Sequence, residues 1–383
     1  MNILYGVVGE GMGHATRSRV ILEHLLSHNI NIRVVVSGHA HKFLTTLFKH
    51  TENITIEEIH GLSIDFEDNA VDIFKTIFNN LIGAPIGILE NLATYVKLIE
   101  DGFIPDMVIS DFESWAYFYA INHGIPVVSI DNMQVLNRCQ HGDDVTNGLD
   151  LDYILAKTIV KMKLPGAYHY LVSSFFFPPV SKERTTLLPP ILRPEILEAK
   201  REIGSHILVY PSVAMREKII DYLKPLPYEF RIYGMKQKSH HDNITIRPFS
   251  EQDFIDDFRT AKAVIAGGGF SMMSEAVHLR VPMLAIPIEG QYEQELNSRY
   301  LKKLGYGDWT RALNKQKIAS FLDNTEKHQK ALQKYTPHDN KMLLRCLDEL
   351  IRDVLINEPP PVRLTKPAKG KYYGTPLADE EIT

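Results

Sequence analysis

Two polar side chains early in the chain have the types and positions that acid–base chemistry needs. His14 follows the glycine-rich segment Gly9–Gly13, where an apolar run gives way to a helical pattern. Asp111 follows a second apolar run, Met107–Ile109. A neutral imidazole with a pKa near about 6.5 can take a proton from a hydroxyl at neutral pH. A carboxylate beside it can fix its tautomer and support the developing imidazolium, so we predict His14 as a general base and Asp111 as its partner.

Each of these two residues also has a purely structural interpretation. His14 is one of 16 histidines and could be a helix-capping or surface side chain. Asp111 could be the N-cap of a helix that begins near Glu113, since a short carboxylate accepts from the first free amides of a helix. The two interpretations of Asp111 do not exclude each other.

The glycines before His14 indicate that a ligand approaches the backbone at this turn. Gly11 and Gly13 lie between a predicted strand and a predicted helix, whose N-terminus favours negative charge. The spacing is G-x-G-x-G-H rather than the G-x-G-x-x-G of dinucleotide-binding folds. The next predicted strand ends in Val36-Ser37-Gly38, without the acidic residue that holds a ribose in those folds. The pattern therefore argues against NAD.

A second glycine turn lies in the C-terminal half of the chain. The predicted strand 263–266 opens into Gly267, Gly268 and Gly269, and a helix is predicted to begin near Ser271. Backbone amides and the helix dipole at such a turn form a cradle for a diphosphate. Glu275 lies one turn into the helix, where a carboxylate can accept both hydroxyls of a ribose.

The segment after the next predicted strand is polar. It runs from Glu289 to Asn297 and contains Glu293 and Gln294. Carboxylates and amides suit a sugar, whose hydroxyls need paired donors and acceptors. The alternative for the whole stretch is a strand–turn–helix unit that binds no ligand.

Short β-branched and apolar runs alternate with helical segments along the whole chain, which predicts an α/β protein with parallel sheets. Six runs precede residue 185 and five follow residue 205. The break between them contains Pro189, Pro190 and Pro194, which suit an extended linker. We predict an N-terminal Rossmann-like domain over 1–185, a linker over 186–205, a C-terminal Rossmann-like domain over 206–350 and a tail over 351–383. A proline-rich loop inside one large domain is the alternative.

Two apolar segments do not fit this strand–helix alternation. Residues 73–99 form a long, largely apolar helical stretch, which is either core or a channel or peripheral membrane contact for a greasy acceptor. Phe175, Phe176 and Phe177 end the first domain's last predicted strand, and we expect them to pack between the domains.

Composition and charge limit the class of protein. The net charge of -5 and the dispersed Lys and Arg residues disfavour nucleic-acid binding. The only cysteines, Cys139 and Cys346, predict neither a disulfide framework nor a zinc site. No secretory signal or membrane-spanning run is visible, so a cytoplasmic location is expected. The acidic pairs Asp143-Asp144 and Asp256-Asp257 are read as solvated faces or loops, and no metal site is predicted.

The glycine turn and polar segment of the second half resemble the donor-binding motif of GT-B glycosyltransferases. The likeness is to the lipid-intermediate N-acetylglucosaminyltransferase (family 28) and UDP-glucuronosyltransferase groups, and the N-terminal glycine loop resembles their acceptor-side loop. The matching positions, in order, are Gly267–Gly269, Ser271, Glu275, Pro282, Pro287, Glu293, Gln294 and Asn297. The sequence departs from the pattern at Arg280, where a glycine is usual.

The resemblance implies a fold of two Rossmann-like domains facing across a cleft. It implies that Gly268, Gly269 and Ser271 hold the diphosphate, with Ser212 as a further contact, and that Glu275 holds the ribose. Glu293 and Gln294 would hold the donor sugar and Phe249 would lie against the base. His14 and Asp111 would be the base and its partner, as the residues themselves suggest.

The implied reaction is the inverting, metal-independent transfer of a sugar from a UDP-sugar substrate, with no tightly bound cofactor, to a hydroxyl acceptor. The acceptor would be lipid-linked or a glycan, and the enzyme would work in the cytoplasm, at or near the inner face of the membrane. Three other functions stay open. The pattern from Gly11 to Arg17 also resembles a UDP-sugar hydrolase of the pseudaminic acid pathway, a nucleotide-sugar 2-epimerase shares the fold, and a non-catalytic donor-binding subunit is the third alternative.

Overall fold

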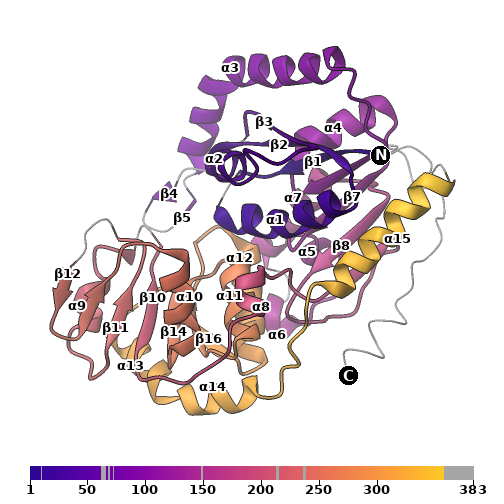
Figure 1. The fold of residues 1–383 in the computed structure, drawn as a ribbon. Helices are drawn as coiled ribbons and strands as arrows, with labels where there is room; N and C mark the ends of the chain where they lie inside the picture. Colours follow the sequence, from indigo (N-terminus) through magenta and orange to yellow (C-terminus); the bar gives the residue numbers. More distant parts are fainter. Residues whose placement is uncertain are drawn as a thin grey trace.

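The computed structural model describes residues 1–9, 11–61, 66–67, 70–71, 73–147, 150–212, 215–235 and 239–357. The chain forms two α/β domains, each built on a sheet, and the N-terminal domain lies above the C-terminal one in the view of Figure 1. The predicted tail lies outside the described residues from position 358 onward.

The N-terminal domain is built on a parallel seven-stranded sheet. Its strand order is β3-β2-β1-β6-β7-β8-β9. The strands are β1 (Asn2–Val7), β2 (Asn31–Val36), β3 (Ile54–Glu58), β6 (Met107–Asp111), β7 (Val127–Asp131), β8 (His169–Ser173) and β9 (Thr185–Leu188). The helices are α1 (Met12–Ser27), α2 (Gly38–Leu47), α3 (Ile73–Glu100), α4 (Ser114–His123), α5 (Val135–Arg138), α6 (Asp143–Thr146) and α7 (Leu151–Lys163). Two short strands, β4 (Phe66–Glu67) and β5 (Ala70–Val71), pair apart from the main sheet.

The C-terminal domain repeats this arrangement. Its sheet has the order β12-β13-β11-β10-β14-β15-β16, with β12 antiparallel to β13 and the other pairs parallel. The strands are β10 (Ile207–Tyr210), β11 (Phe230–Ile232), β12 (Ser239–His241), β13 (Ile244–Ile246), β14 (Ala263–Gly267), β15 (Met283–Ile286) and β16 (Gly307–Trp309). The helices are α9 (Ile219–Leu223), α10 (Glu251–Thr260), α11 (Phe270–His278), α12 (Tyr292–Lys303), α13 (Lys315–Asp323) and α14 (Thr325–Leu332), and α8 (Pro194–Leu197) lies between the domains in sequence.

The strand order reverses direction at the same place in both sheets. In the N-terminal sheet the chain moves outward in opposite directions on the two sides of the β1–β6 pair, and in the C-terminal sheet on the two sides of the β10–β14 pair. Open α/β sheets bind ligands in the crevice at such a switch point, beyond the carboxyl ends of the strands. The loops after β1, β6, β10 and β14 are therefore the loops that the topology places at ligand sites, and they carry most of the predicted residues.

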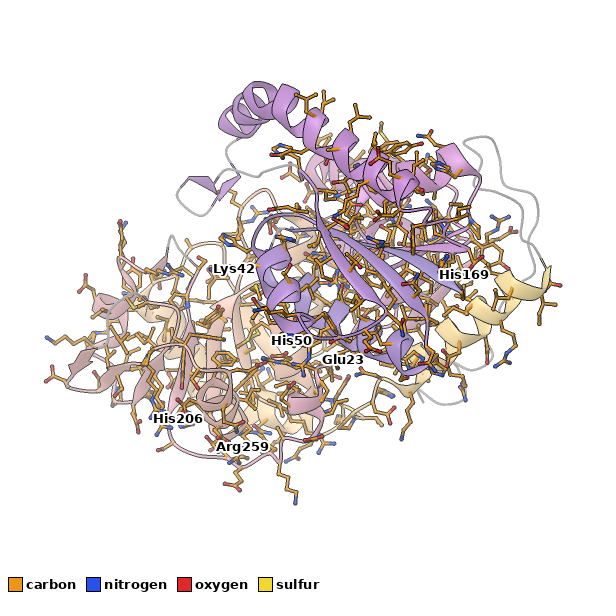
Figure 2. All side chains as sticks on the ribbon, turned by 45° about the horizontal axis from the view of Figure 1, so that its top comes forward. Glu23, Lys42, His50, His169, His206 and Arg259 are labelled. Atoms are coloured by element: carbon orange, nitrogen blue, oxygen red, sulfur yellow. The ribbon has the colours of Figure 1, made fainter. Side chains whose placement is uncertain are left out.

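The structure confirms the predicted α/β architecture and places the domain limits differently. Thr185–Leu188 is the edge strand β9, so the sheet runs three residues past the predicted end of the first domain. His169 of β8 lies in this domain (Figure 2), and its Nε2 atom is 2.9 Å from Thr186 Oγ1 of β9. Pro194 occupies the first turn of α8, where a missing N–H costs nothing.

The last described helix, α15 (Lys341–Asn357), returns to the N-terminal domain, as the yellow helix of Figure 1 shows. Its buried side chains join the apolar cluster of β1, β2 and α1; they are Leu343, Leu347, Leu350, Ile351 and Val354. His24 of α1 adds a hydrogen bond, with its Nε2 atom 2.7 Å from Asp348 Oδ1. The prediction that residues 341–350 belong to the C-terminal domain is therefore wrong, because their apolar face is buried against the other domain.

Aromatic side chains pack across the domain interface. Phe176 stacks on Tyr300 of α12 with ring centroids 3.8 Å apart, and Phe175 stacks on Phe270 at the start of α11 at 6.1 Å. A hydrogen bond crosses the same interface, because Asn297 Nδ2 donates to Asn132 Oδ1 over 3.1 Å. The prediction that this segment packs between the domains is confirmed for Phe175 and Phe176, whereas Phe177 is 36% exposed.

Helix α3 exposes apolar side chains along the part of it for which side chains are described. These are Ile88, Leu89, Leu92, Val96 and Ile99, between 41% and 66% exposed. They recur at helical spacing, so they form one stripe on the outer face of the helix. The core interpretation holds for Leu98, which is fully buried in the N-terminal core, and is wrong for the five exposed side chains. Residues 73–86 lie outside the side chains described. Within the described chain, no helix has the length and hydropathy to cross a bilayer.

Candidate active site

The loop after β1 brings His14 to the carboxyl end of β6. Helix α1 begins directly after Gly11, whose φ of 84° lies in the left-handed region that favours glycine. His14 is in the first turn of α1, and the Asp111 carboxylate is at the end of β6 beside β1. The two residues are 97 positions apart in sequence, and the parallel pairing of β1 with β6 brings them together.

His14, Asp111 and Arg17 form one hydrogen-bonded group. His14 Nδ1 lies 2.9 Å from Asp111 Oδ1, and Arg17 Nε donates to Asp111 Oδ2 over 2.8 Å. The guanidinium also donates to Asp111 Oδ1 through Nη2, and Ser18 Oγ donates to Oδ2 over 3.1 Å. The carboxylate accepts from three side chains, and His14 keeps a partly exposed ring. Arg17 Nη2 also lies 2.6 Å from His14 Nδ1, so the contacts of this atom depend on the tautomer. In the tautomer whose Nδ1–H donates to Asp111, Nε2 carries the lone pair that can accept a proton.

The charges in this group favour a neutral imidazole beside an ionised carboxylate. Burial alone raises the pKa of Asp111, but the positive charge of Arg17, with His14 and the hydrogen bonds, brings it down to about 2. Burial lowers the pKa of His14, the Arg17 charge lowers it further, and Asp111 opposes both. A neutral His14 at physiological pH is the protonation state that a general base needs.

The N-cap of α4 is Glu113 and not Asp111. The Glu113 carboxylate accepts from Trp115 N over 2.8 Å and from Ala116 N over 2.7 Å. The carboxylate of Asp111 instead accepts the side-chain hydrogen bonds of the His14 group. The capping interpretation of Asp111 is wrong.

The glycine turn after β14 faces this group from the other domain. A Cβ atom at Gly268 would lie 2.7 Å from Pro287 Cα, so this position must be glycine for the chain to pass. A Cβ at Gly269 would meet nothing within 4 Å, and Gly269 is the N-cap residue of α11. The first amides of α11 therefore border open space, where helix polarity favours an anion. Ser271 Oγ is 3.4 Å from Gly13 O, so the two predicted glycine loops meet across the cleft.

Glu275 is buried and is held by an arginine from the linker. Arg193 Nε donates to Oε1 over 2.8 Å and Nη2 donates to Oε2 over 2.9 Å. Burial raises the pKa of Glu275, and the Arg193 charge opposes this. Arg193 also donates to Glu251 Oε1 over 2.7 Å. Glu275 thus lies one turn into α11 as predicted, with both oxygens already bonded to a cation.

Glu293 and Gln294 lie at the start of α12 and have different surroundings. Glu293 accepts from Asn297 Nδ2. The charge of Arg17 lowers the pKa of Glu293 and the charge of Asp131 raises it. Burial raises the pKa of Glu293 to about 7. Gln294 accepts from Ile288 N over 3.1 Å and donates to Gln291, so its amide fastens its own loop. Glu293 faces the cleft, whereas the amide of Gln294 is engaged within the Ile288–Gln291 turn.

The remaining two predicted donor contacts lie around the C-terminal sheet. Ser212 follows β10 and is partly exposed. Phe249 follows β13 and is 61% exposed, with its ring 5.9 Å from that of Phe254. An exposed aromatic face is what a stacked base needs.

Sequence reasoning missed three charged residues of this region. Arg17 lies three positions after His14 and therefore on the same helix face, a spacing that could have identified it. Asp131 ends β7 as Asp111 ends β6, it is fully buried, and burial raises its pKa to about 6. Arg193 belongs to the proline-rich linker, where no periodicity indicates its partner Glu275.

The two facing Rossmann-like domains and this cleft define the fold class of the protein as GT-B. Solved structures of that fold align along nearly the whole chain. Phytolacca americana UGT2, in complex with UDP-2fluoro-glucose and pterostilbene, has a TM-score of 0.62 at 15% identity, covering 92% of this chain and 99% of that one. Acinetobacter baumannii MurG has a TM-score of 0.57 at 16% identity, covering 91% and 99%.

Sequence comparison gives the family. Residues 1–325 match the family described as Glycosyl transferase family 1, and the chain belongs to it. A relative from Methanosarcina mazei, named "Uncharacterized glycosyltransferase", is 27% identical over 337 residues, which are 80% of this chain and 85% of the relative. A relative of the same name from Methanosarcina acetivorans is 22% identical over 377 residues, 92% and 88% of the two chains. The protein is a glycosyltransferase.

Proposed function

We propose that the protein transfers a sugar from a UDP-sugar to a hydroxyl acceptor with inversion, using His14 as the general base and no metal ion. The observation that carries this proposal is the His14–Asp111–Arg17 group, which faces the Gly267–Gly269 turn across the cleft. A UDP donor is supported by the matched donor motif and by the fold shared with Phytolacca americana UGT2, whose structure contains UDP-2fluoro-glucose.

In the proposed reaction the acceptor oxygen attacks the anomeric carbon while its proton passes to His14 Nε2. The bond from that carbon to the diphosphate oxygen breaks, and the nucleoside diphosphate leaves with the electron pair. Asp111 holds Nδ1–H and supports the imidazolium as it forms. The amides at Gly269 and Ser271 and the α11 dipole offset the charge on the leaving group, which is the part that a metal ion plays in other transferases.

We propose that Arg193 and Glu275 act together on the donor. Glu275 would accept the ribose hydroxyls with its remaining lone pairs, while Arg193 fixes its orientation through two hydrogen bonds. Glu293 would hold a hydroxyl of the donor sugar, because it lies between Asn297 and the charged group of the N-terminal domain. Phe249 would stack on the base, and Ser212, Gly11 and Gly13 would contact the phosphates or the acceptor.

The first experiment titrates the purified protein with UDP, dTDP, GDP and CMP and follows thermal stability. A ligand that binds only the folded state at 100 times its Kd stabilises that state by roughly 2.7 kcal/mol. Selective stabilisation by UDP that is lost in Glu275→Ala supports the donor site. An equal response to all four nucleotides, or none, would contradict the proposed donor.

Turnover then tests the base. His14→Ala should lower kcat by about 10²–10⁴-fold while UDP affinity stays within a few fold, since the imidazole acts only on the acceptor proton. Activity with EDTA present tests the metal-free mechanism. Full activity of His14→Ala would remove His14 from the reaction, and free sugar released at an enzymatic rate without acceptor would favour a hydrolase.

The acceptor is proposed to carry an apolar part, as a lipid-linked hydroxyl compound does. The exposed stripe of α3 from Ile88 to Ile99 supports this, because five apolar side chains at helical spacing otherwise face water. Flotation with anionic lipid vesicles is the test. Leu92→Glu should reduce vesicle binding, whereas Leu355→Glu on α15, at a similarly exposed position, should not.

A further inference from the structure

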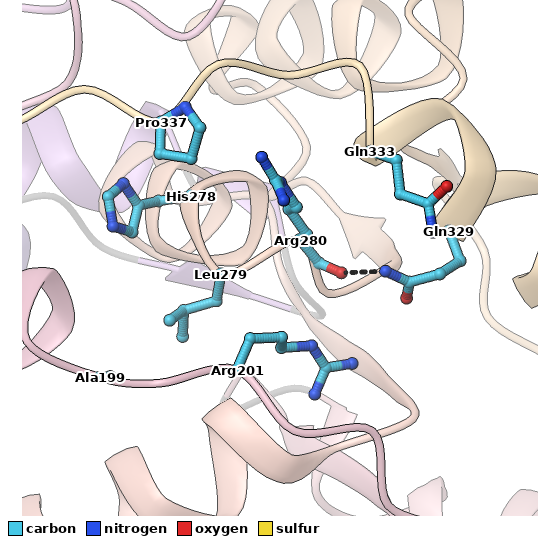
Figure 3. Close-up of a pocket in the computed structure, with 8 residues that line it drawn as sticks. All are labelled: Ala199, Arg201, His278, Leu279, Arg280, Gln329, Gln333 and Pro337. Carbon is cyan, nitrogen blue, oxygen red and sulfur yellow. Dashed lines mark hydrogen bonds between the residues drawn. The ribbon is translucent and has the colours of Figure 1, made fainter.

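A cavity of about 390 Å³ lies in the C-terminal domain at the end of α11 that is remote from the glycine turn. The eight residues that line it come from the linker, the end of α11 and the α14 region; they are Ala199, Arg201, His278, Leu279, Arg280, Gln329, Gln333 and Pro337. Figure 3 shows Arg280 and Arg201 above and below, with the two glutamines on one side and His278 and Pro337 on the other. Helix α11 has nine residues, roughly 13 Å at 1.5 Å per residue, so this cavity is separate from the cleft.

Three nitrogen atoms of this cavity are buried without a partner. In the part of the chain that the structure describes, Arg201 Nε, Arg280 Nε and His278 Nδ1 have no hydrogen-bond partner. Each Nε–H needs an acceptor, and Nδ1 needs an acceptor or a donor according to the tautomer of the ring. Buried polar groups in proteins are almost always bonded, and an orphaned group is costly. All three belong to side chains that line one cavity, so a ligand bound there, with a small side-chain adjustment, could supply the missing partners.

The charges at the cavity select the kind of ligand. Arg201 is anchored only by neutral carbonyls, with Nη1 donating to Arg259 O over 2.6 Å and Nη2 to Ala261 O over 2.7 Å. Arg280 Nη2 likewise donates to Tyr335 O over 3.1 Å. Across the described residues no carboxylate pairs with either guanidinium, and none of the eight lining residues is acidic. Burial lowers the pKa of Arg201 to about 10, which leaves it charged at neutral pH.

We propose that this cavity is an anion site that binds the phosphate group of a small phosphorylated molecule. A phosphate supplies both the negative charge and the acceptor lone pairs that two unpaired guanidiniums lack, whereas a water molecule supplies lone pairs alone. The volume lies in the range of small-molecule sites, roughly 300–1,000 Å³. Gln329 lines the cavity and donates to Arg280 O over 3.0 Å, and its side-chain carbonyl can accept from a hydroxyl next to the phosphate. Neither the donor nor His14 takes part in this site.

Isothermal titration calorimetry of the full chain with inorganic phosphate and with a hexose phosphate tests the site, with chloride at matched ionic strength as the blank. We expect saturable 1:1 binding of the phosphate compounds. Arg280→Gln and His278→Leu should each weaken it at least tenfold, and circular dichroism checks that both variants are folded. Two variants are used because Arg280 also holds the Tyr335 carbonyl.

Two controls separate the cavity from other sources of binding. Lys334→Gln removes a positive charge from an exposed neighbour that does not line the cavity, so binding should be unchanged. Gly269→Asp places a carboxylate at the glycine turn of the cleft, where it repels a phosphate bound there but not one at Arg280. Binding lost in Gly269→Asp and kept in Arg280→Gln would place the phosphate in the cleft and overturn the proposal, as would the absence of saturable binding. Tighter binding of the hexose phosphate than of inorganic phosphate would show that the site also contacts the sugar attached to the phosphate.

Discussion

At the scale of single residues, the proposed role of His14 as general base predicts how the reaction depends on pH. The pKa of His14 is lowered by burial and by the charge of Arg17, so the imidazole stays unprotonated to a lower pH than an ordinary histidine does. Activity as kcat/KM should therefore rise with pH on an acid limb that lies below the ordinary histidine range, and then level off. A pH–rate profile measures this limb.

Replacing Arg17 with glutamine should move that limb to higher pH. The change removes the positive charge that disfavours protonated His14 and leaves the Asp111 carboxylate, which favours it. Arg17→Lys should restore part of the original profile. Arg19→Gln is the matched control, because Arg19 pairs with Glu23 and Glu195 away from this group. An unshifted limb in Arg17→Gln would show that another group limits the rate at low pH.

Glu293 gives a stability prediction with a definite sign. Its folded pKa is about 7 against an ordinary 4.5, so the folded state binds the proton more tightly than the unfolded state. The stability that this supplies is present below about pH 4.5 and is lost as pH rises through about 7. At pH 8 the difference between the folded and unfolded pKa values lowers the free energy of unfolding by an amount on the order of 3 kcal/mol. A ligand that donates a hydrogen bond to Glu293 would offset this loss.

Glu293→Gln removes this cost while keeping an oxygen for Asn297. Its melting temperature should exceed that of the wild type by an amount that grows between pH 5 and pH 8. Glu289→Gln, at an exposed position of the preceding loop, should show no such trend. A constant difference between the two proteins at all pH values would contradict the raised pKa.

At the scale of elements, the linker and α11 are joined through a buried ion pair. Removing one partner of such a pair leaves an uncompensated charge and costs about 3–5 kcal/mol, whereas replacing both with apolar residues can be nearly neutral. Arg193→Met should therefore lower the free energy of unfolding strongly, because Glu275 is 7% exposed and loses both hydrogen bonds. The double variant Arg193→Met/Glu275→Met should recover most of the loss in urea unfolding. Additive losses would indicate that the two residues do not act as a pair.

Helix α15 is attached to the N-terminal domain by one apolar face, and two leucines of the same helix test this. Leu347 is fully buried and Leu355 is 55% exposed. Leu347→Ala should cost about 2–5 kcal/mol of unfolding free energy through lost burial and a cavity, while Leu355→Ala should cost no more than about 0.5 kcal/mol. Both changes have the same effect on helix propensity, so the difference measures the docking of α15.

The sequence predicted the elements whose signal is local. The β-branched runs gave the strands near His14 and Asp111, and the side chain at the end of each run marked the crevice. The partners of those side chains are contributed by distant segments, and periodicity does not reveal them. Arg193 meets Glu275 across 82 positions, and α15 crosses to the other domain because its apolar face fits there. The edge strands β12 (Ser-His-His) and β16 (Gly-Asp-Trp) contain no apolar β-branched run, unlike the equally short β11 and β13, so the sequence pattern does not reveal them.

At the scale of the whole molecule, aromatic stacking at the interface aligns the two halves of the cleft. His14 lies on one domain and the Gly269 turn on the other, so the reaction needs the domains in register. Phe176 is 2% exposed and its ring stacks 3.8 Å from that of Tyr300, whereas its neighbour Phe177 is 36% exposed. Burying a phenyl ring across the interface favours this arrangement of the domains, and in the proposed reaction such an arrangement would keep water from the anomeric carbon.

Phe176→Ala should loosen this arrangement while each domain keeps its own core. We expect a larger radius of gyration by small-angle scattering, two separated thermal unfolding transitions, and a fall in transfer that exceeds the fall in UDP affinity. Water would then compete with the acceptor, so the ratio of donor hydrolysis to transfer should rise. Phe177→Ala should resemble the wild type in all three measurements. If Phe176→Ala scatters and transfers like the wild type, the polar contacts such as Asn132–Asn297 hold the domains in register without the stacked rings.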